Sequence, residues 1–365
     1  MEVIAAVLRE PKCSLSIERL NLGEPSPDEV LVRIVACGIC HTDVACRDAH
    51  LPLPLPIVLG HEGAGVVERV GQSVADLVPG DHVLLSFGHC GRCSPCLEGN
   101  APYCDHFSGL NFGGTRPDGS TALHDGTGPV HSHFFGQSAF SSHVLVHRLN
   151  AVRIPKDLSL ETLAPLGCGI QTGAGAVLNC LKPDAGESIA VFGVGAVGLS
   201  AIMAAKIAGC QRIVAVDRLV ERLHVAQALG ATDCIVAGPA RELPAAIRSL
   251  SGAVDYAVDT TGNRDVAAAA VQSVRRQGVC MMLGIYLPGD QLPIDMRFLV
   301  RNGITLRGSV EGDSDPRTFL PTLIKHFTDG RLPLQKLIKH YPLRDINEAL
   351  SDAATCKVLK PVILL

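Results

Sequence analysis

The chain has 365 residues, more than one ordinary domain, so its length predicts two domains. Charged residues make up 19% of the sequence and the formal net charge is −4. This mild balance excludes the strongly basic classes that bind nucleic acid or an anionic membrane surface. The N-terminus lacks a signal-peptide pattern, and no apolar run approaches the roughly 20 residues of a spanning helix. We therefore expect a soluble protein.

The first 150 residues or so predict a β-rich domain. Short strand-like runs such as VLVRIVAC (30–37) and GAGVVERV (63–70) alternate with Gly, Pro and Asp turns. Residues 105–140 show little periodicity and are rich in Gly, His and Ser, which predicts a long loop or insertion. The histidines of these regions are expected to be exposed loop residues: His50, His82, His89, His131 and His133.

Four cysteines lie within one short stretch: Cys90, Cys93, Cys96 and Cys104. Four thiolates at such spacing suit a tetrahedral structural zinc ion with no open position. An iron–sulfur cluster is the alternative, although the chain has no second cluster motif. Thiols available for metal indicate a reducing compartment, and we expect the cytoplasm. Cys37 and Cys46 match no ligand position and are expected to be packing residues.

From about residue 185 the pattern changes to alternating strands and helices, which predicts an α/β fold with a doubly wound parallel sheet. An apolar strand, SIAVF, precedes a GxGxxG turn, and an alanine-rich helix follows it. Such a turn brings backbone N–H groups and a helix N-terminus to the pyrophosphate of a dinucleotide. The alternative is a plain turn in an α/β protein. The predicted cofactor-binding turn is Gly193, Val194, Gly195, Ala196, Val197 and Gly198.

Asp217 ends the next apolar strand, IVAVD. A carboxylate there accepts hydrogen bonds from ribose hydroxyls and repels a 2′-phosphate, so NAD is favoured over NADP. Arg218 follows directly and offers the opposite charge, which leaves NADP open. Arg222 is a further candidate for cofactor binding. The last fifty residues predict a helix over RTFLPTLIKHFTDG and a terminal strand at KPVILL.

Several motifs occur in a fixed order: GICHTD (38–43), GHEGAG (60–65), the four-cysteine stretch and GCGIQTGAGAV (167–177), ahead of GVGAVG. This set resembles the zinc-containing medium-chain dehydrogenases/reductases. LNFGG (110–114) and LGCGIQTGAGAVLN (166–179) are most similar to the aryl (benzyl) alcohol dehydrogenases. The resemblance implies a GroES-like, β-rich catalytic domain over 1–169 and 311–365, a Rossmann NAD-binding domain over 170–310, and a homodimer or homotetramer.

The resemblance also implies the residues of the active site. Cys40, His61 and Cys168 would bind a catalytic zinc ion, which leaves a fourth position open. Asp43 would orient the histidine ligand, and Glu62 would approach the metal during ligand exchange. Taken alone, each of these residues is more often a core or turn residue, and only the combination favours a metal site.

Other positions are implied around the substrate and the cofactor. Thr42 would hydrogen-bond the substrate hydroxyl, and His41 would contact the pyrophosphate. Ala45 occupies the position of a histidine in the proton relay of liver-type enzymes, so His41 or water would have to complete that route. The remaining implied contacts are Thr172 and Ile285 at the nicotinamide, Lys360 at the pyrophosphate, and Phe87, Phe135 and Ile285 in the substrate pocket.

These features together predict an NAD-dependent zinc alcohol dehydrogenase with two zinc ions per subunit. Two aromatic rings in the pocket favour primary aromatic or allylic alcohols and their aldehydes, although each ring is also a reasonable core residue. A glutathione-dependent formaldehyde dehydrogenase is one alternative. A crystallin-like or nucleic-acid-binding relative without redox chemistry is another, and the retained metal ligands disfavour it.

Overall fold

The computed structural model describes residues 1–365, except for the side chain of residue 251. The chain forms two compact units. The first takes residues 1–168, 315–325 and 334–365, and the second takes 169–314 and 326–333. Residues 326–333, predicted for the catalytic domain, thus cluster with the second unit. Among the described helices, none combines the length and apolar character that a bilayer crossing requires.

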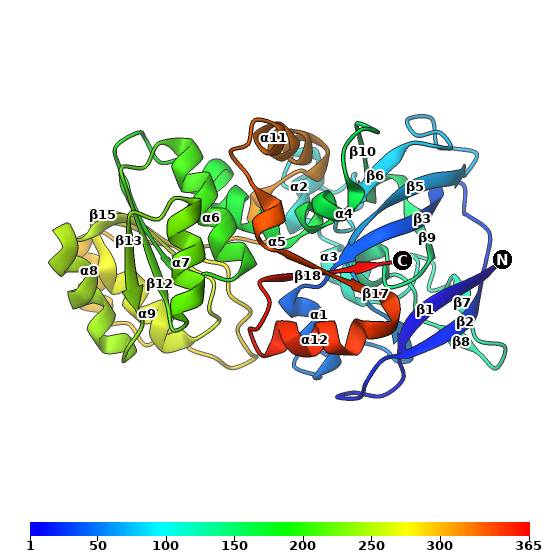
Figure 1. Ribbon diagram of the computed structural model, residues 1–365, viewed down its shortest axis with the longest axis horizontal. Helices are drawn as coiled ribbons and strands as arrows, with labels where there is room; N and C mark the ends of the chain where they lie inside the picture. Colours follow the sequence, from blue (N-terminus) through cyan, green and yellow to red (C-terminus); the bar gives the residue numbers. More distant parts are fainter. The chain divides into compact units, whose positions relative to one another are not determined.

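The first unit is built mainly of strands (Figure 1). One sheet has the order β4-β1-β2-β7-β8, and the other has the order β10-β6-β5-β3-β18-β17 with β9 also paired to β3. The strands are β1 (Glu2–Leu8), β2 (Ser16–Leu22), β3 (Glu29–Gly38), β4 (Ile57–Val58), β5 (Glu62–Val70), β6 (His82–Leu85), β7 (Leu123–His124), β8 (Pro129–Val130), β9 (His143–His147), β10 (Ala151–Ile154), β17 (Ile338–Pro342) and β18 (Lys360–Leu364).

The end of the chain returns to this unit, where β18 pairs antiparallel with β3 through Val362 and Gly38 (Figure 1). On its other side β3 pairs with β5, so that Gly38 is opposite Glu62. The apolar residues of β3 are buried on both faces, as expected of a central strand. The helices are α1 (His41–Arg47), α2 (Ser94–Leu97), α3 (Phe107–Phe112), α4 (Leu160–Leu163) and α12 (Ile346–Ala354), with α11 (Pro316–Thr328) beginning here and ending in the second unit.

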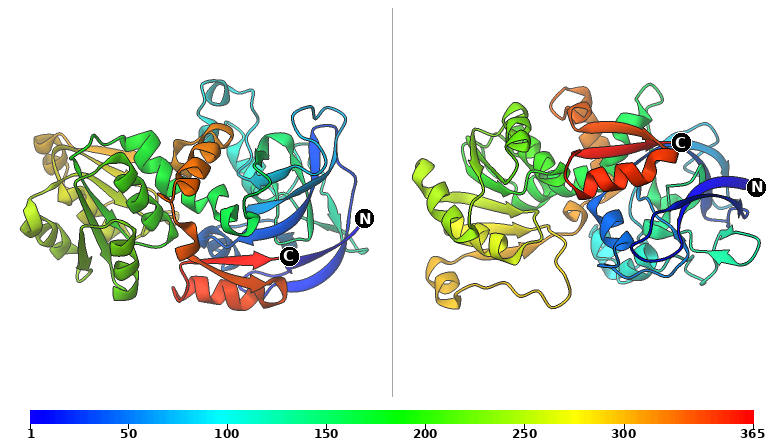
Figure 2. Two further views of the ribbon diagram at one scale, coloured as in Figure 1. Left: turned by 45° about the horizontal axis from the view of Figure 1, so that its top comes forward. Right: turned by 60° about the horizontal axis from the view of Figure 1, so that its bottom comes forward.

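The second unit contains a parallel sheet in the order β13-β12-β11-β14-β15-β16. Figure 2 shows helices on both faces of this sheet. Its apolar strands are therefore buried on both sides, and the order is that of a dinucleotide-binding fold. The elements are α5 (Gly169–Gly175), a π-helical stretch (Ala176–Leu181), β11 (Ser188–Phe192), α6 (Ala196–Ala208), β12 (Arg212–Asp217), α7 (Val220–Leu229), β13 (Asp233–Val236), α8 (Leu243–Ser251), β14 (Val254–Asp259), α9 (Arg264–Ser273), β15 (Val274–Met282), α10 (Met296–Asn302) and β16 (Thr305–Gly308).

The predicted α/β fold class, with a β-rich part and a parallel sheet, is confirmed. The prediction of a long loop over 105–140 is wrong in part, because this segment contains α3 and the paired strands β7 and β8. Of the five histidines predicted to be exposed, only His50 is; His82 and His131 are half-buried, and His89 and His133 are buried. His133 is 5% exposed because it contacts Glu29 and Ser132, and His89 is 9% exposed beside Phe87. Cys37 and Cys46 are buried, as predicted.

Candidate metal centres and cofactor site

Four side chains from distant parts of the first unit meet at one point. Cys40 precedes α1, His61 and Glu62 lie at the start of β5, and Cys168 follows a 3-10 turn over Ala164–Gly167. One ligand atom from each of the four lies within 4.8 Å of the others. The structure therefore brings together the three ligands that the resemblance implies, with Glu62 beside them.

The imidazole of His61 is fixed in a way that suits a metal ligand. Its Nδ1 is 3.1 Å from Oδ1 of Asp43, and both side chains are fully buried. Its Nε2 is also buried and has no hydrogen-bond partner among the described residues. A buried polar atom without a partner is costly, and metal-bound histidines commonly pass their other ring N–H to a carboxylate. This orphaned nitrogen fits a metal ion.

Asp43 holds more than the histidine. Its Oδ1 also accepts from the backbone N–H of Gly60 at 3.0 Å, and its Oδ2 accepts from that of Cys40 at 2.9 Å. One carboxylate thus fixes both ligand segments. A hydrogen bond from the Cys168 thiol lowers the pKa of Cys40 well below its ordinary value, against the effect of burial. Two thiols and one imidazole form a donor set that zinc prefers, with room for a fourth ligand.

Glu62 forms a buried ion pair across the sheet. Nζ of Lys360 lies 2.8 Å from both carboxylate oxygens and donates to the carbonyl of Ile39 at 3.0 Å. Lys360 is 2% exposed and Glu62 is 0% exposed. Gly38 pairs with Glu62 in the neighbouring strand, and an added Cβ on Gly38 would overlap the Glu62 carboxylate. The buried ammonium group of Lys360 is directed at Glu62, and its predicted contact with the pyrophosphate stays a prediction.

Thr42 and His41 lie in the first turn of α1. Oγ1 of Thr42 is 3.6 Å from Sγ of Cys40, so its hydroxyl lies beside the metal-ligand group. The His41 side chain is exposed, whereas Ala45 is buried and carries no proton-accepting group. The geometry thus places a hydroxyl at the site and an exposed imidazole one residue away.

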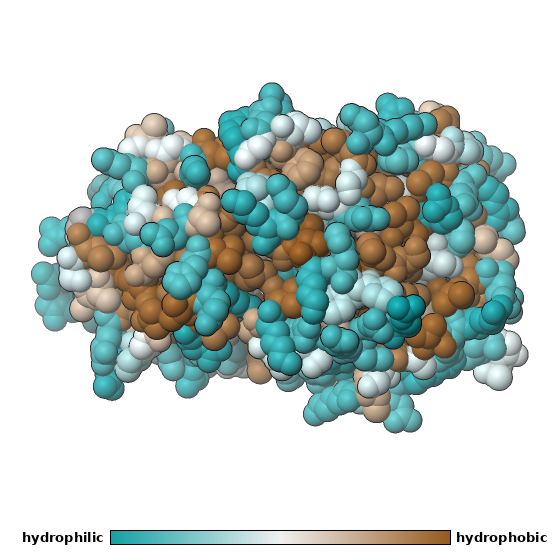
Figure 3. Space-filling model, in the orientation of Figure 1, coloured by the Kyte–Doolittle hydropathy of each residue, from teal (hydrophilic) through white to brown (hydrophobic). Residues whose placement is uncertain are grey.

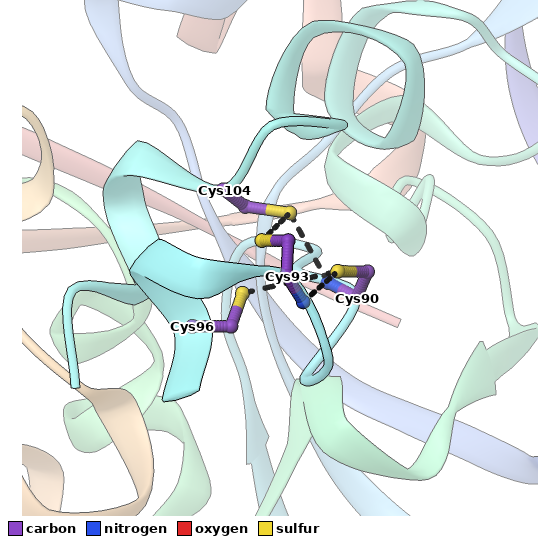
Figure 4. A group of neighbouring side chains, drawn as sticks. All are labelled: Cys90, Cys93, Cys96 and Cys104. Atoms are coloured by element: carbon purple, nitrogen blue, oxygen red, sulfur yellow. Dashed lines mark hydrogen bonds between the residues drawn. The ribbon is translucent and has the colours of Figure 1, made fainter. Parts of the chain in front are cut away.

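The second candidate metal centre is the four-cysteine lobe (Figure 4). Its four sulfur atoms also lie within 4.8 Å of one another. Sγ of Cys104 accepts from the backbone N–H groups of Cys90 at 3.3 Å and His106 at 3.4 Å, and Sγ of Cys90 accepts from that of Cys93 at 3.4 Å. Burial raises the pKa of the Cys90 thiol, but hydrogen bonds from the backbone N–H groups of Arg92 and Cys93 outweigh this effect, so that the pKa falls to about 6. Four converging sulfurs with thiolate-stabilising donors fit a closed tetrahedral zinc site.

In the second unit, the glycine-rich turn joins β11 to α6. Gly193 has φ of 81°, and a Cβ there would lie 2.8 Å from Oγ1 of Thr260. A Cβ on Gly198 would overlap the carbonyl of Gly193. These two glycines are therefore required by packing. Gly195, the N-cap of α6, faces open space apart from the Arg222 guanidinium, which fits close approach of a phosphate to the helix N-terminus.

Asp217 lies at the end of β12, next to this turn. Its Oδ2 accepts from the backbone N–H of Val194 at 2.8 Å, and its Oδ1 accepts from that of Leu219 at 2.9 Å. Arg218 is exposed. Nε of Arg222 is buried without a hydrogen-bond partner among the described residues, while its NH1 would lie 3.7 Å from a Cβ on Gly195. Of the residues predicted to bind a dinucleotide, Asp217 and Arg222 therefore lie at the glycine-rich turn.

Two further residues predicted to contact the cofactor, Thr172 and Ile285, also belong to the second unit. Oγ1 of Thr172, in α5, donates to Glu311 at 3.3 Å. Ile285 is half-buried in the segment after β15. Its carbonyl lies so close to Gly262 that a side chain at position 262 would not fit. Their predicted contacts with nicotinamide stay predictions.

An aromatic cluster packs against His61. The Phe135 ring stacks on the imidazole with centroids 4.5 Å apart and planes inclined by 26°, and Phe134 meets it edge-on at 5.3 Å. Phe112 contacts Phe135 at 5.2 Å and is only half-buried. Phe87 is 1% exposed and packs 5.9 Å from Phe107. Of the two predicted pocket rings, Phe135 therefore lies at the metal centre and Phe87 lies in the core near α3.

Comparison with known proteins agrees with this architecture. Residues 26–156 match the family model "Alcohol dehydrogenase GroES-like domain", and residues 196–327 match "Zinc-binding dehydrogenase". The chain is 43% identical to a geraniol dehydrogenase of Castellaniella defragrans, over 99% of this chain and 97% of that protein. The chain belongs to the zinc-containing medium-chain alcohol dehydrogenases. The predicted family and its GroES-like and Rossmann-type fold are thereby confirmed.

Two other relatives of this dehydrogenase bear on its substrate. The benzyl alcohol dehydrogenase of Acinetobacter calcoaceticus superposes with a TM-score of 0.95 at 40% identity, covering 100% of this chain and 99% of that one. An S-(hydroxymethyl)glutathione dehydrogenase of Saccharomyces cerevisiae is 33% identical, over 100% of this chain and 96% of that protein. The dehydrogenase is thus similar both to enzymes named for geraniol and benzyl alcohol and to an enzyme of the alternative class, the glutathione-dependent formaldehyde dehydrogenases.

Sequence reasoning missed several residues at the metal centre. Phe134 and Gln137 contact His61, Phe112 packs against Phe135, and Gly38 makes room for Glu62. Phe112 lies in the LNFGG motif, but nothing in that motif indicates that its ring meets the other rings. No local pattern marks the others.

Proposed function

We propose that this dehydrogenase interconverts primary aromatic or allylic alcohols and their aldehydes, with NAD as hydride acceptor and two zinc ions per subunit. The substrate class is inferred from the aromatic cluster beside the metal ligand His61. Within this cluster the ring of Phe112 is half-buried. Aromatic walls favour flat, apolar ligands. The similarity to a geraniol dehydrogenase and a benzyl alcohol dehydrogenase supports the same class.

The residues of the first unit divide the chemical work. Cys40, His61 and Cys168 would hold the catalytic zinc, which supplies a Lewis acid that lowers the pKa of an alcohol. The Thr42 hydroxyl accepts the alcohol proton as it passes its own proton on, so that it stays neutral. Because Ala45 has no basic group, the exposed His41 or water carries that proton to solvent. Cys90, Cys93, Cys96 and Cys104 would hold the structural zinc.

The preference for NAD rests on Asp217. Its carboxylate lies at the glycine-rich turn and would face the adenosine ribose, where a 2′-phosphate would meet a like charge. Gly195 and Arg222 leave a positively charged, open approach to the pyrophosphate at the N-terminus of α6. NAD supplies the hydride acceptor.

We further propose a homodimer or homotetramer in the cytoplasm. Figure 3 shows brown, apolar side chains interspersed with teal, polar ones on the face in view. In the second unit, β16 is exposed throughout as an edge strand, and Met296 and Val300 of α10 are 78% and 81% exposed. An open strand edge flanked by apolar side chains suits pairing with a second copy. All fourteen cysteines are free, which suits a reducing compartment.

A substrate panel tests the proposal. Reduction of NAD and NADP is followed by absorbance with benzyl alcohol, geraniol, ethanol and S-(hydroxymethyl)glutathione. We expect the highest kcat/KM for benzyl alcohol or geraniol with NAD. Equal or higher kcat/KM for ethanol would refute the substrate class, and a preference for S-(hydroxymethyl)glutathione would establish the alternative.

A further inference from the structure

The segment Phe134–Ser138 forms a bracket around the metal-ligand segment Gly60–Gly63. It begins in a 3-10 turn over Phe134–Gly136 and lies more than seventy residues after His61 in the sequence. Apart from the assignment of Phe135 to the substrate pocket, none of its residues has a role in the reaction described above. Its contacts nevertheless converge on His61.

The ring of His61 is held on three sides. Phe135 covers one face at 4.5 Å, and Phe134 meets the ring edge-on at an interplanar angle of 88°. Oδ1 of Asp43 is hydrogen-bonded to Nδ1 of the ring at 3.1 Å. The only ring nitrogen left is the buried Nε2, which lies among the ligand atoms of Cys40 and Cys168. These contacts leave the imidazole one orientation, the one that directs Nε2 at the metal position.

The backbone on both sides of the ligand is held by one side chain. Nε2 of Gln137 donates to the carbonyl of His61 at 2.9 Å, and Oε1 of Gln137 accepts from the N–H of Gly63 at 3.0 Å. Gln137 is 0% exposed. A Cβ on Gly63 would lie 3.0 Å from that oxygen and 2.8 Å from Cβ of Ala139, so a glycine is needed for this approach. The amide therefore fixes the start of β5, where His61 and Glu62 lie.

The bracket keeps an unfavourable backbone conformation. Phe135 has φ of 50° and Ser138 has φ of 52°, in the left-handed region that bulky residues avoid. Tertiary contacts hold it there: Asn150 donates to the carbonyl of Phe135 at 3.3 Å, and Ser138 donates to that of Val58 at 2.6 Å. Such strain persists where the surroundings over-determine it, and it gathers at functional sites. Here it turns the Phe135 ring onto the imidazole.

We infer that Phe135 and Gln137 are positioning residues for the histidine ligand of the catalytic zinc: the first fixes the ring of His61 and the second fixes its backbone. This inference rests on the proposed zinc chemistry. It adds a positioning role for Phe135, because one face of its ring is stacked on His61. Residues that orient a metal ligand typically affect metal affinity or activity by about 10–100-fold when removed.

The test compares Phe135→Leu and Gln137→Met with wild type and with Asn111→Leu. Leucine keeps apolar volume without the stacked ring, and methionine keeps the length of glutamine without its hydrogen bonds. Asn111 is a matched control because it is a buried amide of the same unit that bonds only the backbone of Gly88 and Phe107. Zinc affinity is measured by competition with a chelator. The variant His61→Ala, which should lose the catalytic zinc ion, identifies the zinc equivalent that is followed. Cobalt-substituted enzyme gives a second readout through its visible absorption bands.

We expect a zinc dissociation constant about 10–100-fold higher in both variants, with altered cobalt bands, and a value within about twofold of wild type in Asn111→Leu. If Phe135→Leu and Gln137→Met keep the wild-type zinc affinity and cobalt bands, the inference is wrong. A change confined to KM for the alcohol would then assign Phe135 to the pocket. Equal loss of zinc in all three variants, with loss of far-UV circular dichroism, would reduce the bracket to a general structural role. A wild-type enzyme without a His61-dependent zinc equivalent would instead refute the proposed function.

Discussion

Replacing Lys360 by methionine tests how much its buried ion pair with Glu62, beside the candidate catalytic metal centre, contributes to the free energy of unfolding. The substitution keeps a long unbranched side chain and removes the cation that lies 2.8 Å from both oxygens of Glu62. Lys360 and Glu62 are 2% and 0% exposed, so water cannot take over the role of the lost partner. Removing one partner of a buried pair costs about 3–5 kcal/mol, because a buried charge is left uncompensated. We expect the free energy of unfolding in urea to fall by about that amount.

Two further variants make this measurement decisive. Glu62→Gln combined with Lys360→Met removes both charges, and the double variant should be more stable than Lys360→Met alone. Lys357→Met is the matched control, because this lysine lies 3.8 Å from Asp352 but is 69% exposed, and surface pairs contribute about 0–1 kcal/mol. The reasoning fails if Lys360→Met is as stable as Lys357→Met, or if the double variant is no more stable than Lys360→Met.

Three other perturbations follow from the same structure. Gly38→Ala should lower the free energy of unfolding by about 1–3 kcal/mol, because its Cβ overlaps the Glu62 carboxylate; a urea midpoint equal to that of wild type would contradict this. Cys104→Ser should lose one of two zinc equivalents by metal analysis while retaining alcohol-dependent reduction of NAD above background, and retention of both equivalents would argue against a four-cysteine site. Burial raises the pKa of Glu29, but hydrogen bonds from His133 and Arg116 hold it well below its usual value. The ionised Glu29 carboxylate therefore stabilises the fold above the pKa of a glutamate in the unfolded chain, about 4.3, and this contribution is lost as the pH falls toward the lower pKa of the folded state. Glu29→Gln should be less stable than wild type at pH 7, with the difference in melting temperature closing below about pH 4; a difference independent of pH would refute this.

The parts of the site that sequence reasoning anticipated are those encoded over short distances. The four cysteines occupy a lobe of fifteen residues, and the glycine-rich turn is bounded by its own strand and helix. In both cases the spacing alone limits which atoms can meet. The exposure of His89 and His133 was misjudged because the burial of a loop histidine depends on a partner elsewhere. For His133 that partner is Glu29, 104 residues away.

The pairing of Lys360 with Glu62 spans 298 residues and depends on register. It requires that β18 and β5 lie on opposite sides of β3, and that the residue of β3 opposite Glu62 is Gly38, which has no side chain to displace the carboxylate. A lysine near the C-terminus has no local feature that distinguishes an ion pair with Glu62 from a contact with a phosphate. Only the sheet order shows the ion pair with Glu62, and the predicted contact with a cofactor phosphate stays a prediction.

The same dependence on distant segments explains how the histidine ligand keeps its orientation. Asp43 comes from the helix after β3, Phe135 and Gln137 come from the segment after α3, and Cys168 ends the first of the three segments that make up the first unit. None of these segments is near His61 in the chain, so the orphaned Nε2 is positioned only when the β-rich core has formed. Metal binding to this centre is therefore coupled to folding of the first unit. It follows that substitutions in the bracket can weaken zinc binding without touching any ligand.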